Sequence, residues 1–67
     1  MNPETLTFNS NIAHEVKEWA FDLLLNYFDD FDGKVFVKNL VAFKNEIIFM
    51  VKINDVESII RVPLKND

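Results

Sequence analysis

The sequence contains no cysteine, and this absence excludes disulfides, thiolate metal sites and thiol-based redox catalysis together. A single histidine, His14, is too few for the usual zinc sites, and the single glycine, Gly33, leaves no glycine-rich phosphate loop. We therefore expect neither a metal nor a cofactor. A domain of this size buries only about 60% of its unfolded surface, so its stability depends on a dense core or on association.

Basic side chains are also scarce, because seven lysines and arginines stand against eleven acidic residues and the net charge is −4. Binding of nucleic acid depends on basic side chains that neutralise phosphates, so this charge disfavours direct binding. The residues that would carry such binding lie on the predicted sheet: Lys34, Lys38, Lys44, Lys52 and Arg61. An acidic surface suits docking on a basic protein instead.

Long apolar runs are missing as well. The longest one, residues 47–51, is far shorter than the roughly 18 residues that a membrane span needs. The first residues carry neither the basic segment nor the long apolar segment of a secretion signal. We expect no membrane association and a cytoplasmic location.

What is abundant is apolar surface, at 49% of the residues. The first half of the chain predicts one helix, with Asn9, Ser10 or Asn11 as its N-cap. Apolar residues then recur at helical spacing on a stripe centred near Leu23: Ile12, Val16, Trp19, Ala20, Leu23, Tyr27 and Phe31. A second set widens the apolar arc to about 240°, which indicates a helix covered on more than one side: Phe21, Leu24, Leu25 and Phe28.

After Gly33 the apolar period changes from 3.6 to 2 and predicts three strands, over 34–43, 47–53 and 56–64. Asn54-Asp55 suits a two-residue hairpin, which would place Lys52 opposite Glu57, Phe49 opposite Ile60 and Ile47 opposite Val62. Pro63 cannot donate to a ladder, so the third strand is expected at a sheet edge. The most apolar strand, 47–53, then lies in the middle of a meander.

These elements predict one α+β domain over residues 1–67, with an N-terminal helix packed on a three-stranded antiparallel meander (α-β-β-β). We expect residues 1–8 to form a loose arm with Leu6 and Phe8 tacked onto the fold. The turn between the first two strands is ambiguous by one residue, and a one-residue slip exchanges the two faces. One register leaves Val35, Val37, Val41 and Phe43 on the face away from the helix; the other leaves Phe36, Leu40 and Ala42 there.

In both registers Ile48, Met50 and Ile59 lie on this second face. A single helix covers only one face of a three-stranded sheet, so the sheet carries apolar surface that one copy leaves uncovered. The helix and the sheet therefore show the same excess independently.

Three aspartates and the glycine come together between Asn26 and Val37, which raises the question of a calcium loop. Asp30 and Asp32 fit the ligand spacing before Gly33, but Phe28 occupies the first ligand position and Asn39 the closing one. We therefore interpret these aspartates as solvated turn residues. The alternative is that they bind a partner. Gly33 is expected to end the helix in a left-handed conformation.

An acidic strip about 60° wide runs along the predicted helix and continues beyond it: Glu15, Glu18, Asp22, Asp29, Asp30 and Asp32. The simplest interpretation is the solvated face of an amphipathic helix. The alternative is a phosphate-like row of charge that mimics nucleic acid and occupies a basic groove on another protein.

Catalytic residues are not evident. His14 has no predictable nucleophile beside it, since Ser10 and Ser58 are the only serines. A domain this small also has little room for an apolar pocket that would perturb one of two carboxylates. We expect no enzyme.

The leading hypothesis is a non-enzymatic protein-interaction domain that self-associates, as a two-fold dimer. Its apolar interface is expected among Phe21, Leu25, Phe28, Ile48, Met50 and Ile59; Trp19 and Tyr27 are assigned to the core. The alternative is an acidic inhibitor or antitoxin-like protein of phage or bacterial type, which docks its acidic strip on a basic enzyme or nucleic-acid-binding protein.

Overall fold

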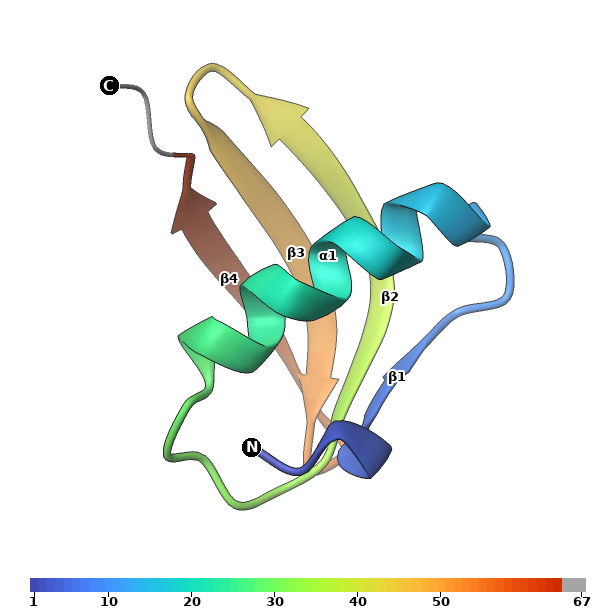
Figure 1. Cartoon of the computed structure of the whole chain (residues 1–67), viewed down its shortest axis with the longest axis vertical. Helices are drawn as coiled ribbons and strands as arrows, with labels where there is room; N and C mark the ends of the chain where they lie inside the picture. Colours follow the sequence, from blue (N-terminus) through green and yellow to red (C-terminus); the bar gives the residue numbers. More distant parts are fainter. Residues whose placement is uncertain (65–67) are drawn as a thin grey trace.

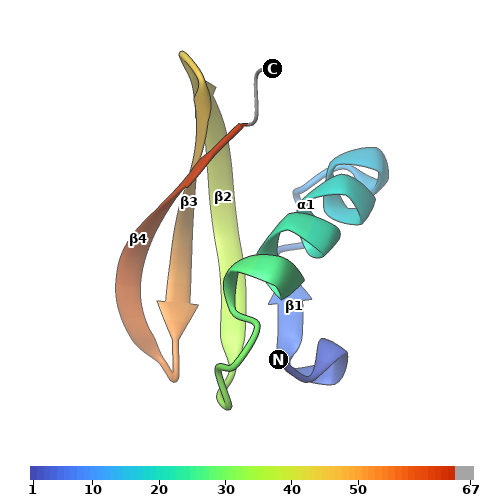
Figure 2. The same ribbon diagram turned by 60° about the vertical axis from the view of Figure 1, so that its left-hand side comes forward.

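The computed structural model describes residues 1–64 of the chain, in which one helix lies across a four-stranded sheet (Figure 1). In chain order the elements are a short 3-10 turn η1 (Pro3–Thr5), β1 (Leu6–Phe8), α1 (His14–Tyr27), β2 (Val35–Phe43), β3 (Glu46–Ile53) and β4 (Val56–Pro63). The predicted α+β class, with a helix followed by a meander, is confirmed. In the turned view the helix stands on one side of β2, β3 and β4 (Figure 2).

The sheet has one strand more than the sequence predicts. Its order is β1-β2-β3-β4, with β1 parallel to β2 and the other pairs antiparallel. The expectation of a loose arm is therefore wrong for residues 6–8. Leu6 lies opposite Val35 and is only 4% exposed, while the Met1 ammonium donates to the Asp29 carbonyl at 2.6 Å. Three residues are too few for an alternating pattern to stand out in the sequence.

The second hairpin forms as predicted. Asn54 and Asp55 adopt φ of 50° and 69°, in the left-handed region that a type I′ turn needs. The pairing Lys52–Glu57, Phe49–Ile60 and Ile47–Val62 is confirmed. β4, which ends at Pro63, is an edge strand, and β3 lies between β2 and β4.

The first hairpin, β2–β3, has a register that changes along its length. The pairing of β2 with β3 shifts between Val37 and Asn39, so that Lys38 is an extra residue in β2. An inserted residue exchanges the two faces of the strand beyond it. Val35 and Val37 therefore face the helix before this bulge, whereas Leu40 and Ala42 face it afterwards, opposite Phe49 and Ile47. Neither of the two uniform registers is correct along the whole strand.

The helix is shorter than its apolar pattern suggests, and none of the expected N-caps is used. It runs from His14 to Tyr27, and the N-cap is Ala13, which makes no side-chain capping bond. Asn9 instead accepts the Asn11 amide through Oδ1 at 3.0 Å, and its carbonyl accepts the Ile12 amide. These bonds form a turn that redirects the chain from β1 into the helix. Asn9 therefore stabilises this turn and does not cap α1, which begins one helical turn later.

Gly33 does not end the helix, because its φ is not positive and α1 ends six residues earlier. Glycine is needed there for space. A Cβ at residue 33 would lie 2.5 Å from the Phe31 ring and 2.8 Å from Asn54 Oδ1. Gly33 is thus required for close packing beside the β3–β4 turn and not for a left-handed backbone conformation.

The buried face of α1 is rotated from the predicted stripe by about one residue, or roughly 100°. Its fully buried residues are Ala20 and Leu24, while Trp19 and Tyr27 are 44% and 51% exposed. The placement of Trp19 and Tyr27 in the core is therefore wrong. With an apolar arc this wide, the periodicity alone does not fix which part of the arc faces the sheet. The core consists of Leu6, Ile12, Ala20, Leu24, Phe28, Val35, Val37, Ile47, Phe49, Val51, Ile60 and Val62.

Asn54 ties the β3–β4 turn to the start of β2. Its side-chain Oδ1 accepts the Lys34 amide and its own amide donates to the Lys34 carbonyl, both at 2.9 Å. We expect Asn54→Ala to lower the free energy of unfolding by about 2 kcal/mol, since it loses a hydrogen bond and strains a left-handed residue. Asn54→Gly should lose only about 1 kcal/mol, because glycine keeps the backbone conformation. Urea denaturation compares the two, and equal losses would contradict a role for the left-handed backbone.

Candidate interaction surfaces

One candidate surface is the face of the β2–β4 meander that points away from α1, called here the outer sheet face. The pairing places Val41, Ile48 and Arg61 in one row and Asn39, Met50 and Ile59 in the next. Val41 is 48% exposed and Ile59 is 68% exposed, while Ile48 and Met50 between them are partly covered by these neighbours. Among the described residues no helix or strand packs on this face (Figure 2).

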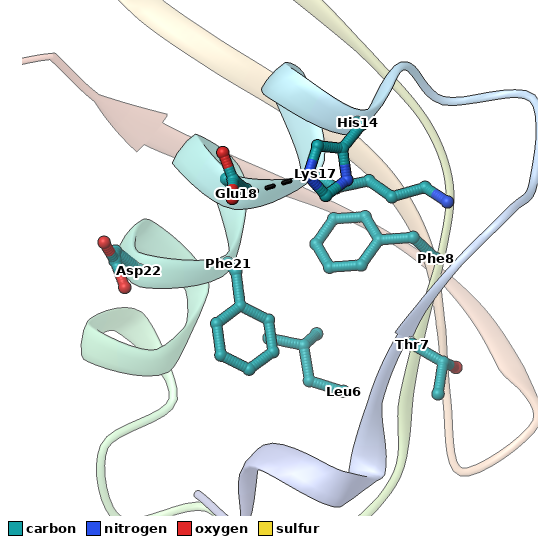
Figure 3. Close-up of a pocket in the computed structure, with 8 residues that line it drawn as sticks. All are labelled: Leu6, Thr7, Phe8, His14, Lys17, Glu18, Phe21 and Asp22. Atoms are coloured by element: carbon teal, nitrogen blue, oxygen red, sulfur yellow. Dashed lines mark ion pairs between the residues drawn. The ribbon is translucent and has the colours of Figure 1, made fainter.

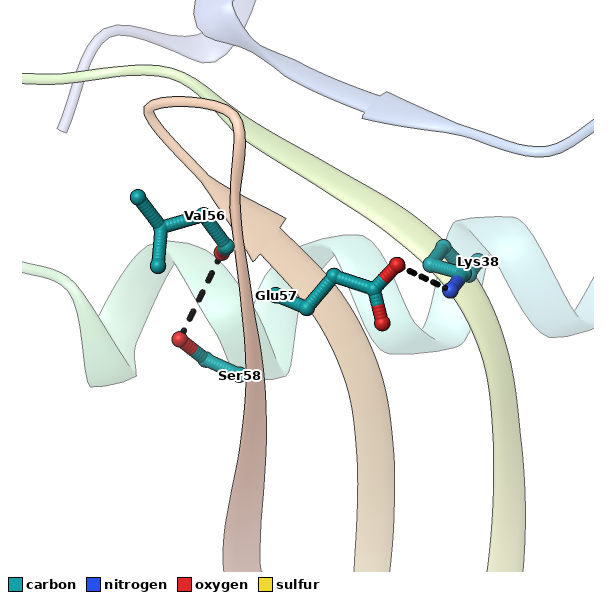
Figure 4. A network of polar contacts seen from close by, with 4 residues as sticks. All are labelled: Lys38, Val56, Glu57 and Ser58. Carbon is teal, nitrogen blue, oxygen red and sulfur yellow. Dashed lines mark hydrogen bonds and ion pairs between the residues drawn. The ribbon is translucent and has the colours of Figure 1, made fainter.

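Ion pairs border the apolar part of the outer sheet face. Lys38 Nζ lies 3.1 Å from Glu57 Oε2, reaching from β2 across β3 to β4 (Figure 4). Glu57 thus has an ion-pair partner from two strands away, whereas the sequence pointed to its cross-strand neighbour Lys52. Lys38 follows the inward-facing Val37, so strand alternation places it on the outer face, and the bulge brings Asn39 onto that face as well. At the other end Arg61 Nη2 donates to Glu46 Oε2 at 3.0 Å.

The outer sheet face therefore has an apolar centre between two charged ends. This is the general layout of protein interfaces, which combine an apolar middle with a polar rim. Of the predicted apolar interface residues, Ile48, Met50 and Ile59 lie on this face.

The other three predicted apolar residues lie elsewhere. Phe28 is 8% exposed, and its ring contacts the rings of Tyr27 and Phe31 at centroid distances of 5.0 and 5.4 Å. It belongs to the core, which corrects its assignment to an interface. Phe21 and Leu25 are half-buried and pack against the core from the side of α1.

Three residues of the stripe that the sequence places against the sheet form an apolar row that the sheet leaves open: Trp19 and Tyr27 are exposed and Leu23 is partly buried. Trp19, Leu23 and Tyr27 are spaced at i, i+4 and i+8, which places them along one line of the helix surface. Trp19 also lines a groove against the second half of β2, where it lies near Leu40 and Val41. The width of the apolar arc was the available signal, since an arc of about 240° exceeds what one sheet face covers.

The acidic strip is exposed along its whole length, as the sequence indicates. Glu15, Glu18 and Asp22 are on α1, and Asp29, Asp30 and Asp32 follow it in the connection to β2. Glu18 Oε2 lies 3.4 Å from His14 Nε2 one turn earlier. Residues 13–32 hold one lysine against six acids, a net charge of −5, whereas residues 34–64 hold five basic side chains against three acids, a net charge of +2. The helix layer is therefore acidic and the sheet layer weakly basic.

A groove runs between β1 and α1 (Figure 3). Its apolar lining is Leu6 and Phe8 from the strand and Phe21 from the helix, and its charged rim is His14, Lys17, Glu18 and Asp22. In the part of the chain that the structure describes, β1 pairs with β2 and with no strand on its other side, so this groove lies beside an open sheet edge.

Within residues 1–64, no group of three histidine, cysteine, aspartate or glutamate side chains is placed to hold a metal ion. No polar side chain in that range is buried. No helix that the structure describes is long and apolar enough to cross a membrane.

Comparison of this chain with family models, with curated proteins and with solved structures finds no match. Any function is therefore inferred from the surfaces themselves.

Phe21 in α1 and Phe28 at its C-terminal end provide a test of which aromatic side chains form the core. Phe28→Ala should lower the free energy of unfolding by about 3–5 kcal/mol, close to the whole stability of a domain of this size. Phe21→Ala should lower it by less than half as much, since its ring is only half-buried. Urea denaturation measures both, and Phe28→Leu provides a milder variant if Phe28→Ala does not fold. A smaller loss for Phe28→Ala than for Phe21→Ala would place the Phe28 ring outside the core.

Proposed function

We propose that this chain is a non-enzymatic interaction module that self-associates as a two-fold dimer through its outer sheet face. The observation that supports the proposal is the bare apolar centre of that face, where Ile59 and Val41 are exposed beside Met50 and Ile48. Monomeric proteins seldom leave a contiguous apolar surface of this kind in water. A second copy of the same face supplies the matching apolar surface.

The geometry of the sheet suits closed pairing. Two twisted sheets pack face to face about 10 Å apart, with their strands inclined by about 30°. A two-fold axis between the Met50–Ile59 row and the Val41–Ile48 row would bring the apolar centres together, with the Lys38–Glu57 pair on one side of it and the Arg61–Glu46 pair on the other. Exposed charge pairs at a rim keep much of their hydration, so they add little cost.

Head-to-tail stacking would place the acidic helix layer on the weakly basic sheet layer, so the two-fold arrangement is favoured by its apolar centre and not by net charge. In the two-fold dimer both acidic helix layers point outward and lie on opposite sides of the assembly. The association closes at two copies, because each copy uses its outer sheet face once.

Ile59→Asp tests this interface. The substitution places a carboxylate in the apolar centre, so we expect the dimer to dissociate and the sedimenting mass to fall from twice 7.9 kDa to 7.9 kDa at micromolar concentration. Val56→Asp is the matched control, since Val56 lies on the same strand and is similarly exposed, at 64%, but has the opposite side-chain parity. It should leave the dimer intact. A wild-type chain that sediments at 7.9 kDa, or a dimer that survives Ile59→Asp, would contradict the proposal.

A second candidate function rests on the acidic strip. Its six carboxylates are exposed, and residues 13–32 carry most of the negative charge of the chain. The strip would attract a basic groove on an enzyme or nucleic-acid-binding protein, as an acidic inhibitor or antitoxin-like protein does.

Reversing Asp22 and Asp29 to lysine tests this second function. Proteins that the wild-type chain retains from its host extract should be lost by the double variant, with an unchanged thermal melting curve, because both side chains are exposed. Glu4→Lys with Asp55→Asn is the control, as it raises the net charge by three at exposed acids outside the strip, against four in the strip variant, and asparagine tolerates the left-handed backbone of residue 55. Equal loss of binding in the control would reduce the effect to net charge, and unchanged retention by the strip variant would remove the function.

A further inference from the structure

The groove between β1 and α1 combines two features that the dimer interface does not use. One is the open edge of β1, and the other is an apolar floor beside it. Both lie on the helix side of the molecule, away from the outer sheet face (Figures 2 and 3). We propose that this groove binds an extended segment of another polypeptide, which adds a strand to β1 and places an apolar side chain between Leu6, Phe8 and Phe21.

The backbone of β1 is oriented for such pairing. The Asn9 amide donates to the Val37 carbonyl at 2.9 Å, so the backbone groups of Asn9 and, by alternation, Thr7 point toward β2. The amide and carbonyl of Phe8 then point the other way, along the open edge. The Leu6 amide also points away from β2 and is bonded to the Pro3 carbonyl, which closes the lower end of the edge. Phe8 is therefore the residue that presents both an outward donor and an outward acceptor.

The side chains of β1 determine which residues of the added strand enter the groove. Leu6 and Phe8 face α1, whereas Thr7 faces away and is exposed. An adjacent strand has the same alternation, so every second side chain of the bound segment points into the space under Phe21. Figure 3 shows the Phe8 ring below Lys17 and the Phe21 ring beside Leu6, with space between the two rings.

Charge defines the chemistry of the bound segment. The rim carries Glu18 and Asp22 against Lys17, a net charge of −1, on a helix layer whose net charge is −5. A segment with lysine or arginine two residues from its apolar side chain would place the basic group on the same side, beside these carboxylates. The site therefore selects a basic–apolar strand over an acidic one. Because β1 is only three residues long, backbone bonds alone are few, and the side-chain contacts must supply the specificity.

A synthetic heptapeptide, acetyl-Thr-Lys-Thr-Val-Thr-Lys-Thr-amide, is the probe for this site. Its valine and two lysines lie on one face when it is extended. In an NMR titration we expect saturable shifts at the amides of Thr7, Phe8 and Phe21, together with slower hydrogen exchange of the Phe8 amide. The same peptide with glutamate in place of lysine should bind at least threefold more weakly at low salt. Equal binding of the two peptides, or shifts confined to the outer sheet face, would overturn the proposal.

Two variants at one position isolate the backbone bond. Phe8→Ala and Phe8→Pro both remove the ring, but only proline removes the outward amide, and neither changes the Asn9 bond to Val37. We expect Phe8→Pro to bind the peptide about three- to tenfold more weakly than Phe8→Ala. Equal affinities would show that no strand is added at this edge.

The test separates this site from the dimer interface. Ile59→Asp should bind the peptide with unchanged affinity, since Ile59 is on the other face of the sheet. A Phe8 amide that is already protected in the free protein, and loses that protection on dilution, would show that a second copy occupies the edge. That result would overturn the peptide proposal and leave the outer-face dimer to be judged by its own variants.

Discussion

The structure depends on one constraint: a single 14-residue helix can cover only one face of a sheet whose strands are apolar on both. The helix-facing side chains of β3, Ile47, Phe49 and Val51, are at most 3% exposed, and this face forms the core. The alternate residues of the same strand, Ile48 and Met50, have no element above them among residues 1–64. Burial of apolar area contributes roughly 25 cal/mol per Å², so the uncovered face holds stabilisation that the chain cannot realise alone.

The bulge at Lys38 increases the number of apolar side chains of β2 that lie on the helix side of the sheet. With a uniform register, either Val35 and Val37 or Leu40 and Ala42 would point away from the helix. One extra residue lets both pairs lie on the side of α1, where Val35 and Val37 are in the core, Leu40 packs against it and Ala42 stays exposed. The cost is that Val41 and Phe43 then face outward, at 48% and 52% exposed. The bulge thus adds apolar side chains to the helix side of β2 and, with Val41 and Phe43, to the outer face as well.

Local chemistry was sufficient to predict the parts of the fold that depend on neighbouring residues. The Asn54-Asp55 hairpin follows from two side chains that tolerate positive φ, and its register then places three pairs correctly. The rotation of α1 and the use of β1 depend on distant partners. Leu24 rather than Leu23 faces the sheet, and residues 6–8 pair with a strand that begins nearly thirty residues later. Periodicity predicts that a helix exists, but in an arc of about 240° it does not identify the covered side.

The candidate surfaces differ in how strongly the sequence indicates them. Ile48, Met50 and Ile59 were identified from strand alternation, because a period of two leaves only two faces to choose between. Phe28 was assigned to an interface and Trp19 to the core, and both assignments were wrong because they depended on which face of the predicted helix meets the sheet. The sequence contains no indication of the β1–α1 groove. The groove is formed by β1, which was not predicted as a strand, where it passes beside Phe21.

Charge segregation explains how these surfaces remain compatible. The acids lie on the helix layer, with a net charge of −5, and the sheet layer carries +2. Two copies that pair through their sheets keep both acidic layers in water, where ions screen them within about 8–10 Å. In the proposed dimer the β1 edge stays open beside a rim that carries Glu18 and Asp22 against Lys17, which would disfavour the binding of further copies of this acidic chain. The two proposed partners therefore differ in chemistry: a basic strand from a different molecule for the open edge of β1, and a second copy of the chain for the apolar sheet face.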